Sequence, residues 1–442
     1  MDSRYINGAF VLAEGSNLLL FNPHLSSSAV VPLVGSDIDE TIRMHKADLI
    51  QKCVLFQDVE ASIDYNGISD FFTKRDAYNT QVVYITDAMS FECNFSCVYC
   101  MQQNTFRDVT PLSPKERALT WEKIRHSLNA QNIVLYLFGG EPFYNADYLG
   151  ELLETAADMS IPISSISAVT NGSLANDKLI NIIRKFGIRS LQITLDGPKN
   201  IHDMRRVSND GASSFDTIMK NIGVFLHETG VRIIINTVLD KQNCTHYVEL
   251  VDDITSRFPQ YIFGSNPRIS FNLGNECHPY NQSEYTQENI LVSNDQTVFF
   301  ENLVALFNKG VCVNSPLPTP RCIATSVNEI VLGPNGDVYQ CISGLGDIEF
   351  LVSKYDEYSE DGSKLLLKQL IYKKPERTAH CDNCNNFALC SGGCKYSKVV
   401  EKKGSVCQME SFSLFMDYYV RIATHVDEIF PTIFRLKEDY KL

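Results

Sequence analysis

The stretch CNFSCVYC, residues 93–100, places three cysteines at the spacing C-x3-C-x2-C. Iron–sulfur clusters prefer such soft thiolate ligands. Three thiolates on a four-iron cube leave one iron without a protein ligand, and an open coordination position is where a small molecule binds. Zinc is the alternative, but zinc sites rarely use three closely spaced cysteines without a fourth ligand. The spacing therefore favours a [4Fe-4S] cluster on Cys93, Cys97 and Cys100.

Strand-like and helix-like segments alternate around and after this motif. Apolar runs predict strands, at 82–85, 133–138, 166–170, 191–195, 231–238 and 269–273. Segments with helical spacing predict helices between them, at 113–128, 149–159, 178–186, 215–228 and 247–258. This alternation predicts an α/β fold with a parallel sheet and outer helices. Six units fit a partial (β/α)6 TIM-type barrel better than a closed barrel of eight strands.

Further motif-like segments stand at or after the predicted strand ends. They are GGEP at 139–142, TNG at 170–172, TLDG at 194–197 and HDMRR at 202–206. Alone, GGEP would indicate only a turn, since Gly and Pro are ordinary turn residues. Behind the cysteine motif, whose last cysteine follows an aromatic residue, these segments resemble the radical SAM superfamily over residues 80 to about 275. The resemblance implies that the cluster cleaves S-adenosylmethionine.

The same resemblance implies which residues contact S-adenosylmethionine. They are Tyr99, Gly139, Gly140, Glu141, Pro142, Asn171, Thr194 and Arg206. The backbone of residues 139–142 would receive the methionyl amine, and Arg206 would bind the methionyl carboxylate in a charge-assisted pair. A surface ion pair is the alternative for Arg206. No catalytic side chain is assigned, because hydrogen-atom removal by a 5′-deoxyadenosyl radical needs no general base.

A second set of cysteines surrounds and follows a predicted hairpin at 329–339, whose Asn335-Gly336 pair is a strong turn signal. The set resembles the seven-cysteine SPASM pattern of radical SAM enzymes that modify peptides and proteins. That resemblance implies two auxiliary clusters, both expected to be [4Fe-4S]. The distal one would be held by Cys381, Cys384, Cys390 and Cys407, and the nearer one by Cys322, Cys341 and Cys394. Zinc is the alternative for the four cysteines at 381–394, since C-x2-C pairs are common zinc ligands.

The nearer auxiliary cluster has three assigned ligands. Sulfatase-maturing relatives place a fourth cysteine where this chain has Asn328. Either Cys312 supplies the fourth ligand, or one iron stays open to substrate or solvent. The sequence leaves both alternatives open.

Composition narrows the function classes. The chain has 442 residues, a formal net charge of −14 and no Lys/Arg block, which argues against binding to nucleic acid or to anionic membranes. No apolar run approaches the roughly 18 residues that span a bilayer, and the start lacks the regions of a signal peptide. We therefore expect a cytoplasmic protein, in which most of the 14 cysteines serve as metal ligands rather than disulfides.

Three domains are predicted: a small α+β domain at 1–78, the barrel at 79–300 and a cysteine-rich SPASM domain at 301–442. In the first, strands are expected at 10–12 and 18–21 and a helix at 37–52. This domain resembles the peptide-recognition domain of ribosomal-peptide maturases, which implies that a leader peptide pairs with an exposed strand edge. A structural extension packed on the barrel is the alternative.

These resemblances imply an oxidoreductase supplied with electrons by a flavodoxin or ferredoxin. The leading hypothesis is a maturase that cross-links a ribosomally made precursor peptide through a carbon–carbon, ether or thioether bond. A sulfatase-type maturase that makes formylglycine is the second, but that group carries an Asp base where this chain has Ile342. The third is a non-enzymatic iron–sulfur electron carrier, which would need neither GGEP nor Arg206.

Overall fold

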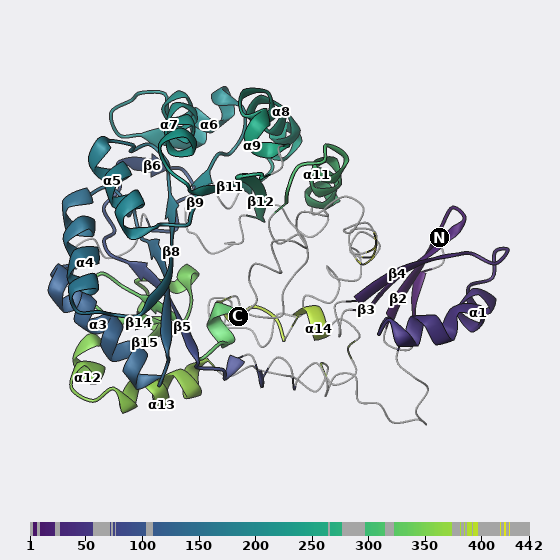
Figure 1. The fold of residues 1–442 in the computed structure, drawn as a ribbon, viewed down its shortest axis with the longest axis horizontal. Helices are drawn as coiled ribbons and strands as arrows, with labels where there is room; N and C mark the ends of the chain where they lie inside the picture. The colour runs from purple at the N-terminus through teal and green to yellow at the C-terminus, as the bar shows by residue number, and fades with distance from the viewer. Residues whose placement is uncertain are drawn as a thin grey trace. The chain divides into compact units, whose positions relative to one another are not determined.

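The computed structural model of this protein divides into two compact units (Figure 1). One unit comprises Met1–Asp76, Ser315–Cys322 and Pro375–Leu442, and the other comprises Ala77–Asn314 and Ile323–Lys374. The predicted domain boundaries near residues 78 and 300 stay predictions. The residues that the structure describes are 3–6, 9–22, 27–55, 71, 74–75, 77–102, 109–263, 266–275, 297–313, 322–373, 381, 384, 387–390, 392–396, 416, 420 and 424.

A large sheet forms the centre of the second unit. Among the described residues it has nine strands, in the order β12-β11-β9-β8-β7-β5-β13-β14-β15. Every neighbouring pair from β12 to β13 is parallel, whereas β13–β14 and β14–β15 are antiparallel. The strands are β5 (Val82–Ala88), β7 (Asn132–Phe138), β8 (Ile163–Thr170), β9 (Ser190–Thr194), β11 (Arg232–Leu239), β12 (Ile269–Asn275), β13 (Glu329–Leu332), β14 (Val338–Tyr339) and β15 (Leu351–Ser353).

All six strands predicted between residues 82 and 273 are confirmed, and so is the mainly parallel α/β sheet. The predicted hairpin is also present, but its first strand, β13, joins the same sheet beside β5. The sequence did not predict that pairing. A second, two-stranded sheet pairs β6 (Phe95–Cys97) antiparallel with β10 (Arg206–Ser208).

Helices that follow the strands lie in an arc along one face of the large sheet (Figure 1). Helix α3 begins as predicted: the Ser113 hydroxyl accepts the Glu116 N–H, the Glu116 carboxylate accepts the Ser113 N–H, and Pro114 takes the first position. The bounds are α3 (Pro114–Ser127), α4 (Ala146–Asp158), α5 (Asp177–Phe186), α6 (Lys199–Arg205), α7 (Ser214–Glu228), α8 (Tyr247–Arg257), α9 (Pro259–Ile262), α11 (Thr297–Asn308), α12 (Tyr355–Ser359) and α13 (Ser363–Tyr372).

Side chains alternate between the two faces of each strand. On β7, Ile133, Leu135 and Leu137 are fully buried, whereas Tyr136 between them is 37% exposed. The buried set forms the core between the sheet and the helices. The other set lies on the opposite face, which we call the inner face.

The N-terminal part of the first unit is a four-stranded antiparallel sheet, in the order β1-β2-β3-β4. Its elements are β1 (Ser3–Ile6), β2 (Ala9–Glu14), β3 (Asn17–Asn22), β4 (Ser27–Pro32) and α1 (Ile38–Gln51). The sequence predicted β2, β3 and α1, and missed the two edge strands. Helix α1 packs on one face of this sheet, and Met416 and Val420 pack on the other. A short helix, α14 (Phe387–Cys390), lies in the same unit.

No helix in the described ranges is both long and apolar enough to cross a membrane.

Candidate active site

The cysteine loop between β5 and α3 is fixed to a distant segment by strand pairing. The β6–β10 register places Cys97 opposite Arg206. The Asn209 side chain donates to the Cys93 carbonyl at 3.2 Å and accepts the Ser96 hydroxyl at 2.8 Å. The loop and the HDMRR segment therefore form one rigid assembly, although about a hundred residues separate them in the sequence.

The cysteine thiols lie in a largely desolvated place. Burial raises the pKa of Cys97 to about 12 and also raises the pKa of Cys93. The charges of Glu141 and Arg206 both act on Cys93, so the predicted cluster ligands and S-adenosylmethionine contacts converge. Such thiols stay protonated near neutral pH unless a metal displaces the proton. The residues present thus fit a group that binds thiolates strongly.

GGEP packs against the backbone that enters the cysteine loop. The Gly140 N–H donates to the Ser90 carbonyl at 2.9 Å, and the Glu141 N–H donates to the Glu92 carbonyl at 2.8 Å. A Cβ at Gly139 would lie 2.3 Å from the Ser90 oxygen, and one at Gly140 would lie 2.1 Å from the Glu92 oxygen. Only glycine allows this approach, which brings the end of β7 beside residue 93.

Glu141 joins two strand ends. Its buried carboxylate accepts the Thr170 hydroxyl at 2.7 Å, the Asn171 N–H at 2.7 Å and the Phe143 N–H at 3.0 Å. The Asn171 amide in turn donates to the Asn94 side chain at 2.8 Å and lies 3.9 Å from the Cys93 sulfur. The Glu141 carboxylate therefore positions the loops around a ligand, and any contact of residues 139–142 with the methionyl amine would come from the backbone.

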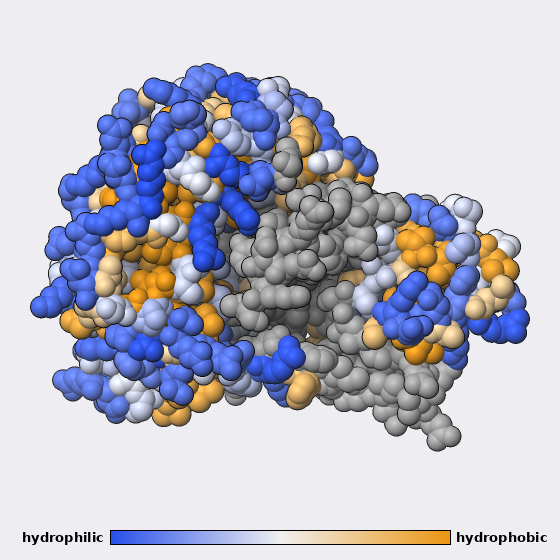
Figure 2. Space-filling model, in the orientation of Figure 1, coloured by the Kyte–Doolittle hydropathy of each residue, from blue (hydrophilic) through white to orange (hydrophobic). Residues whose placement is uncertain are grey.

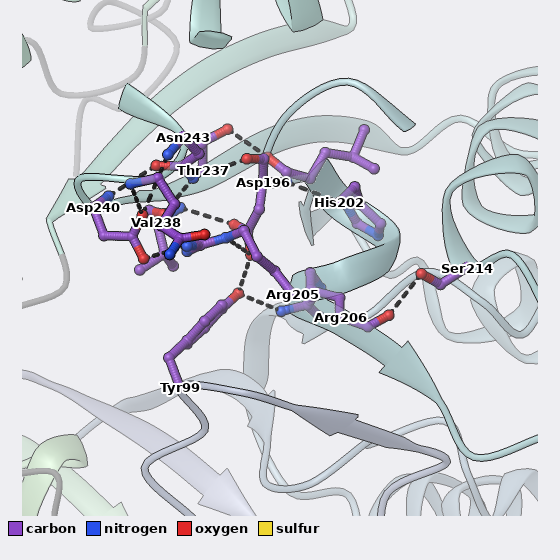
Figure 3. A network of polar contacts seen from close by, with 12 residues as sticks. Tyr99, Asp196, His202, Arg205, Arg206, Ser214, Thr237, Val238, Asp240 and Asn243 are labelled. Carbon is purple, nitrogen blue, oxygen red and sulfur yellow. Dashed lines mark hydrogen bonds and ion pairs between the residues drawn. The ribbon is translucent and has the colours of Figure 1, made fainter. Parts of the chain in front are cut away.

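Tyr99 connects Arg206 to the end of β9 (Figure 3). Its hydroxyl donates to the Asp196 carboxylate and accepts from Arg206 Nη1 at 2.8 Å. Arg206 is 8% exposed, and its buried Nε has no partner among the described residues. Leaving a buried donor unsatisfied costs about 1–3 kcal/mol, more for a charged group. The arrangement therefore favours an anionic ligand such as a carboxylate on Arg206.

Arg205, the neighbour of Arg206, is already occupied by the protein. It forms an ion pair with Asp240, lies 3.5 Å from Asp196 and donates to the Val238 carbonyl at 3.0 Å (Figure 3). Its guanidinium also stacks 4.9 Å from the centre of the Tyr99 ring. The structure thus separates two arginines that the sequence alone could not distinguish.

The remaining residues of the HDMRR segment hold the fold together. Asp203 accepts the Phe215 N–H at 2.9 Å at the start of α7. His202 accepts the Asp196 N–H at 3.2 Å, and burial lowers the pKa of His202 to about 3. Thr194 is buried at the end of β9, as the sequence placed it. The sequence reasoning missed Asp240 and other members of the network, because they belong to no motif.

Residues 88–254 match the profile of the radical SAM superfamily. The chain belongs to that superfamily. Membership implies S-adenosylmethionine and a [4Fe-4S] cluster as cofactors, and the unpartnered Arg206 Nε and the buried thiols fit both.

Several curated relatives are radical SAM enzymes or maturases. The radical SAM cyclopropyl synthase TigE of Paramaledivibacter caminithermalis is 23% identical, over 81% of this chain and 77% of that protein. The cysteine-type anaerobic sulfatase-maturating enzyme of Clostridium novyi is 25% identical, over 70% and 86%. The mycofactocin maturase MftC of Mycobacterium ulcerans is 23% identical, over 72% and 84%.

Solved structures share the fold. Native anSMEcpe with bound AdoMet superposes with a TM-score of 0.61 at 19% identity, over 77% of this chain and 99% of that one. Streptococcus suis SuiB bound to precursor peptide SuiA gives a TM-score of 0.52 at 15% identity, over 91% and 98%.

The cysteines predicted to hold auxiliary clusters of this radical SAM enzyme lie in both units. Cys341 is buried directly after β14, and Cys322 is exposed. The half-buried cysteines of the C-terminal part are Cys381, Cys384, Cys390 and Cys394. Cys407 falls outside the described residues. The ligand assignments and the choice between iron and zinc stay predictions.

Two residues that bear on the open position of the nearer cluster have defined surroundings. The Asn328 amide is buried and donates to the Val82 carbonyl at 2.8 Å, so this side chain anchors the start of β13 to β5. The Cys312 carbonyl accepts the Phe271 N–H at 2.8 Å, which places Cys312 alongside β12. Burial raises the pKa of Cys312, and Arg232 partly offsets that rise.

Proposed function

We propose that this radical SAM enzyme modifies a ribosomally made precursor peptide and forms an intrapeptide cross-link through a carbon–carbon, ether or thioether bond. The observation that carries the proposal is the buried Arg206 with its unpartnered Nε, held by strand pairing beside the cysteine loop. When bound, the cluster and S-adenosylmethionine supply a 5′-deoxyadenosyl radical that removes a hydrogen atom from the substrate. The peptide substrate is supported by the maturase relatives.

The chain's own residues bind and orient the cofactor. Arg206 would pair with the methionyl carboxylate, since charge-assisted bonds to arginine are strong and directional. Tyr99 keeps its proton because burial raises its pKa, so its hydroxyl holds Arg206 while donating to Asp196. The glycines at 139–140 bring the strand end close enough for their backbone to reach the methionyl amine.

The N-terminal sheet is proposed to bind the leader part of the precursor. Strand β4 lies at an edge of this sheet, and extended peptides bind such edges through main-chain hydrogen bonds. Val30 on β4 is 43% exposed and Met44 on α1 is 62% exposed. Figure 2 shows apolar residues at the surface of this part of the chain. SuiB, whose fold is shared, binds its precursor peptide SuiA.

A sulfatase-type maturase is the second candidate, supported by the Clostridium novyi relative. In that reading residue 342 should be an acidic base. Ile342 instead packs against a hydrophobic cluster that includes Ala88, Val331 and Leu345. The position is built for apolar packing, which disfavours formylglycine formation.

The test is anaerobic co-expression with the short peptide encoded beside this gene, followed by mass spectrometry. A cross-link removes two hydrogen atoms from the peptide, whereas formylglycine formation replaces a side-chain thiol or hydroxyl by an aldehyde. A variant with Cys93, Cys97 and Cys100 all changed to Ala should lose one cluster and make no 5′-deoxyadenosine. An unmodified peptide with a fully loaded, cofactor-cleaving wild type would reject the proposal.

A further inference from the structure

Polar side chains occupy the inner face of the sheet near the carboxyl ends of its last strands. On β11, Ile233 and Ile235 are fully buried, and Asn236 follows on the opposite face. Parallel pairing places Asn236 beside Thr194 of β9 and beside Asn272 of β12. These three residues form one layer across three neighbouring strands, and the layer includes a predicted S-adenosylmethionine contact, Thr194.

Asn236 and Asn272 are joined side chain to side chain. The Asn272 amide nitrogen donates to the Asn236 amide oxygen at 2.7 Å. Each amide has one carbonyl oxygen and two N–H donors. The bond leaves the Asn236 N–H donors and the Asn272 oxygen without a partner among the described residues. The pair therefore presents a donor and an acceptor side by side.

The approach to this pair from the carboxyl end of β12 is open at the next inward position. Gly274 occupies that position, and a Cβ added there would meet the Asn236 amide oxygen at 3.7 Å. Asn236 lies two strands from β8, whose end leads into Asn171, so the lateral separation is roughly 10 Å at about 5 Å per strand. A ligand on the amide pair would therefore lie next to S-adenosylmethionine rather than on the cluster.

We propose that Asn236 and Asn272 bind one peptide group of the substrate and so position the residue that loses its hydrogen atom. A peptide C=O accepts from Asn236, and the adjoining peptide N–H donates to Asn272. Neither amide carries charge, so the contact selects for a peptide backbone or a side-chain amide rather than for a charged side chain. The inference rests on the proposed function and names the group that the site recognises.

The first test compares Asn272→Leu with Ser270→Ala in the full-length, cluster-loaded enzyme. Leucine keeps the volume of Asn272 and removes its hydrogen-bonding groups, and Ser270 is the preceding inward residue of the same strand. With the precursor peptide found by mass spectrometry, Asn272→Leu should lower kcat/KM about 2- to 12-fold, the factor for one neutral hydrogen bond. The ratio of 5′-deoxyadenosine to modified peptide should rise, and the Kd for S-adenosylmethionine should not change. Should the leucine variant lose iron, Asn272→Ala replaces it with the same expectation.

The second test removes the partner group from the substrate. Esters replace one peptide N–H at a time along the modified segment. One ester should slow the wild type by the same factor and should not slow Asn272→Leu further, because a contact already lost cannot be lost twice.

The outcomes separate the two ideas. If ester and variant effects add at every position, or if Asn272→Leu behaves like Ser270→Ala, the amide pair does not bind the peptide. A Kd for S-adenosylmethionine that weakens as much as peptide turnover would assign the pair to the cofactor and overturn the inference. A wild type that cleaves S-adenosylmethionine but modifies no peptide would reject the proposed function, and this inference with it.

Discussion

At the scale of single residues, the site depends on which polar groups the protein leaves unsatisfied. Arg205 and Arg206 are adjacent in sequence, yet two carboxylates and a carbonyl surround Arg205, whereas Arg206 keeps a free Nε. A buried guanidinium tolerates that state only if a ligand completes it. Residue type alone therefore says little about which arginine binds the cofactor.

Arg206→Ala should weaken S-adenosylmethionine binding and leave iron content intact. Loss of a charged hydrogen-bond partner costs about 1.5–3 kcal/mol, or roughly 10- to 150-fold in Kd. Titration calorimetry under anaerobic conditions measures the change, with the half-exposed Arg184 of α5 changed to Ala as the control. An unchanged Kd in Arg206→Ala would move the carboxylate contact elsewhere.

His202 should make the unfolding free energy depend on pH. The unfolded side chain binds a proton near its ordinary pKa of 6.5, whereas burial lowers the folded pKa to about 3. Its contribution is therefore fully present above pH 6.5 and is lost as pH falls toward 3, by about 1.4 kcal/mol per pH unit. Chemical denaturation at pH 7.5 and 5.5 should show a loss in the wild type that is smaller by about that amount in His202→Gln. Equal losses in the two proteins would contradict a buried neutral imidazole.

At the scale of elements, loop packing at the carboxyl ends of the strands builds the site. The end of β7 meets the loop after β5 through backbone hydrogen bonds at Gly140 and Glu141. β6 then pairs with β10, which ties the cysteines to the segment after α6. Each contact is made by backbone, so the geometry of the site depends on chain path as much as on side chains.

Gly140→Ala should damage the cysteine loop, because its Cβ would lie 2.1 Å from the Glu92 carbonyl oxygen. The backbone there must shift, so we expect lower iron content and at least a tenfold loss of S-adenosylmethionine cleavage. Gly223→Ala on α7 is the matched control. Its Cβ would meet Phe258 at an ordinary 3.7 Å, and alanine in a helix adds about 0.5–1 kcal/mol of stability. Full activity and iron in Gly140→Ala would show that the close approach is not needed.

At the scale of the whole molecule, two compact units carry different proposed tasks. The unit with the large sheet contains Cys93, Cys97, Cys100 and the predicted S-adenosylmethionine contacts. The other unit combines the N-terminal sheet with C-terminal residues, since Met416 and Val420 pack on β2 and β3. Truncating the first 75 or so residues would remove the partner of those side chains, so point variants test leader binding better than a deletion.

Val30→Asp should weaken binding of a full-length precursor at least tenfold while sparing cleavage of S-adenosylmethionine without peptide. A charge on the edge strand β4 opposes the addition of another strand. Fluorescence anisotropy of a labelled precursor measures the affinity. Met159→Asp, at another partly exposed apolar position that lies in the other unit, is the control. If Val30→Asp and Met159→Asp bind the precursor equally well, the leader does not use this edge.

The sequence by itself determined the local structure and the family. Periodicity within windows of about ten residues placed six strands and the helices between them, and Ser113 marked the start of α3. Cys93, Cys97 and Cys100 indicated the cluster because a short spacing already confines three thiols to one loop. Such features depend on neighbours along the chain, so they can be read without knowing the fold.

Tertiary structure decided everything that depends on strand order and register. It placed β13 beside β5, gave the Glu141 carboxylate to Thr170 and Asn171, and left Arg206 free while Arg205 was paired. It also brought Asn236 and Asn272, 36 positions apart, to one hydrogen bond. These contacts join residues from separate strands, and a register shift of one residue would turn each side chain to the opposite face. No local pattern encodes that choice, because it results from packing the whole sheet against its helices.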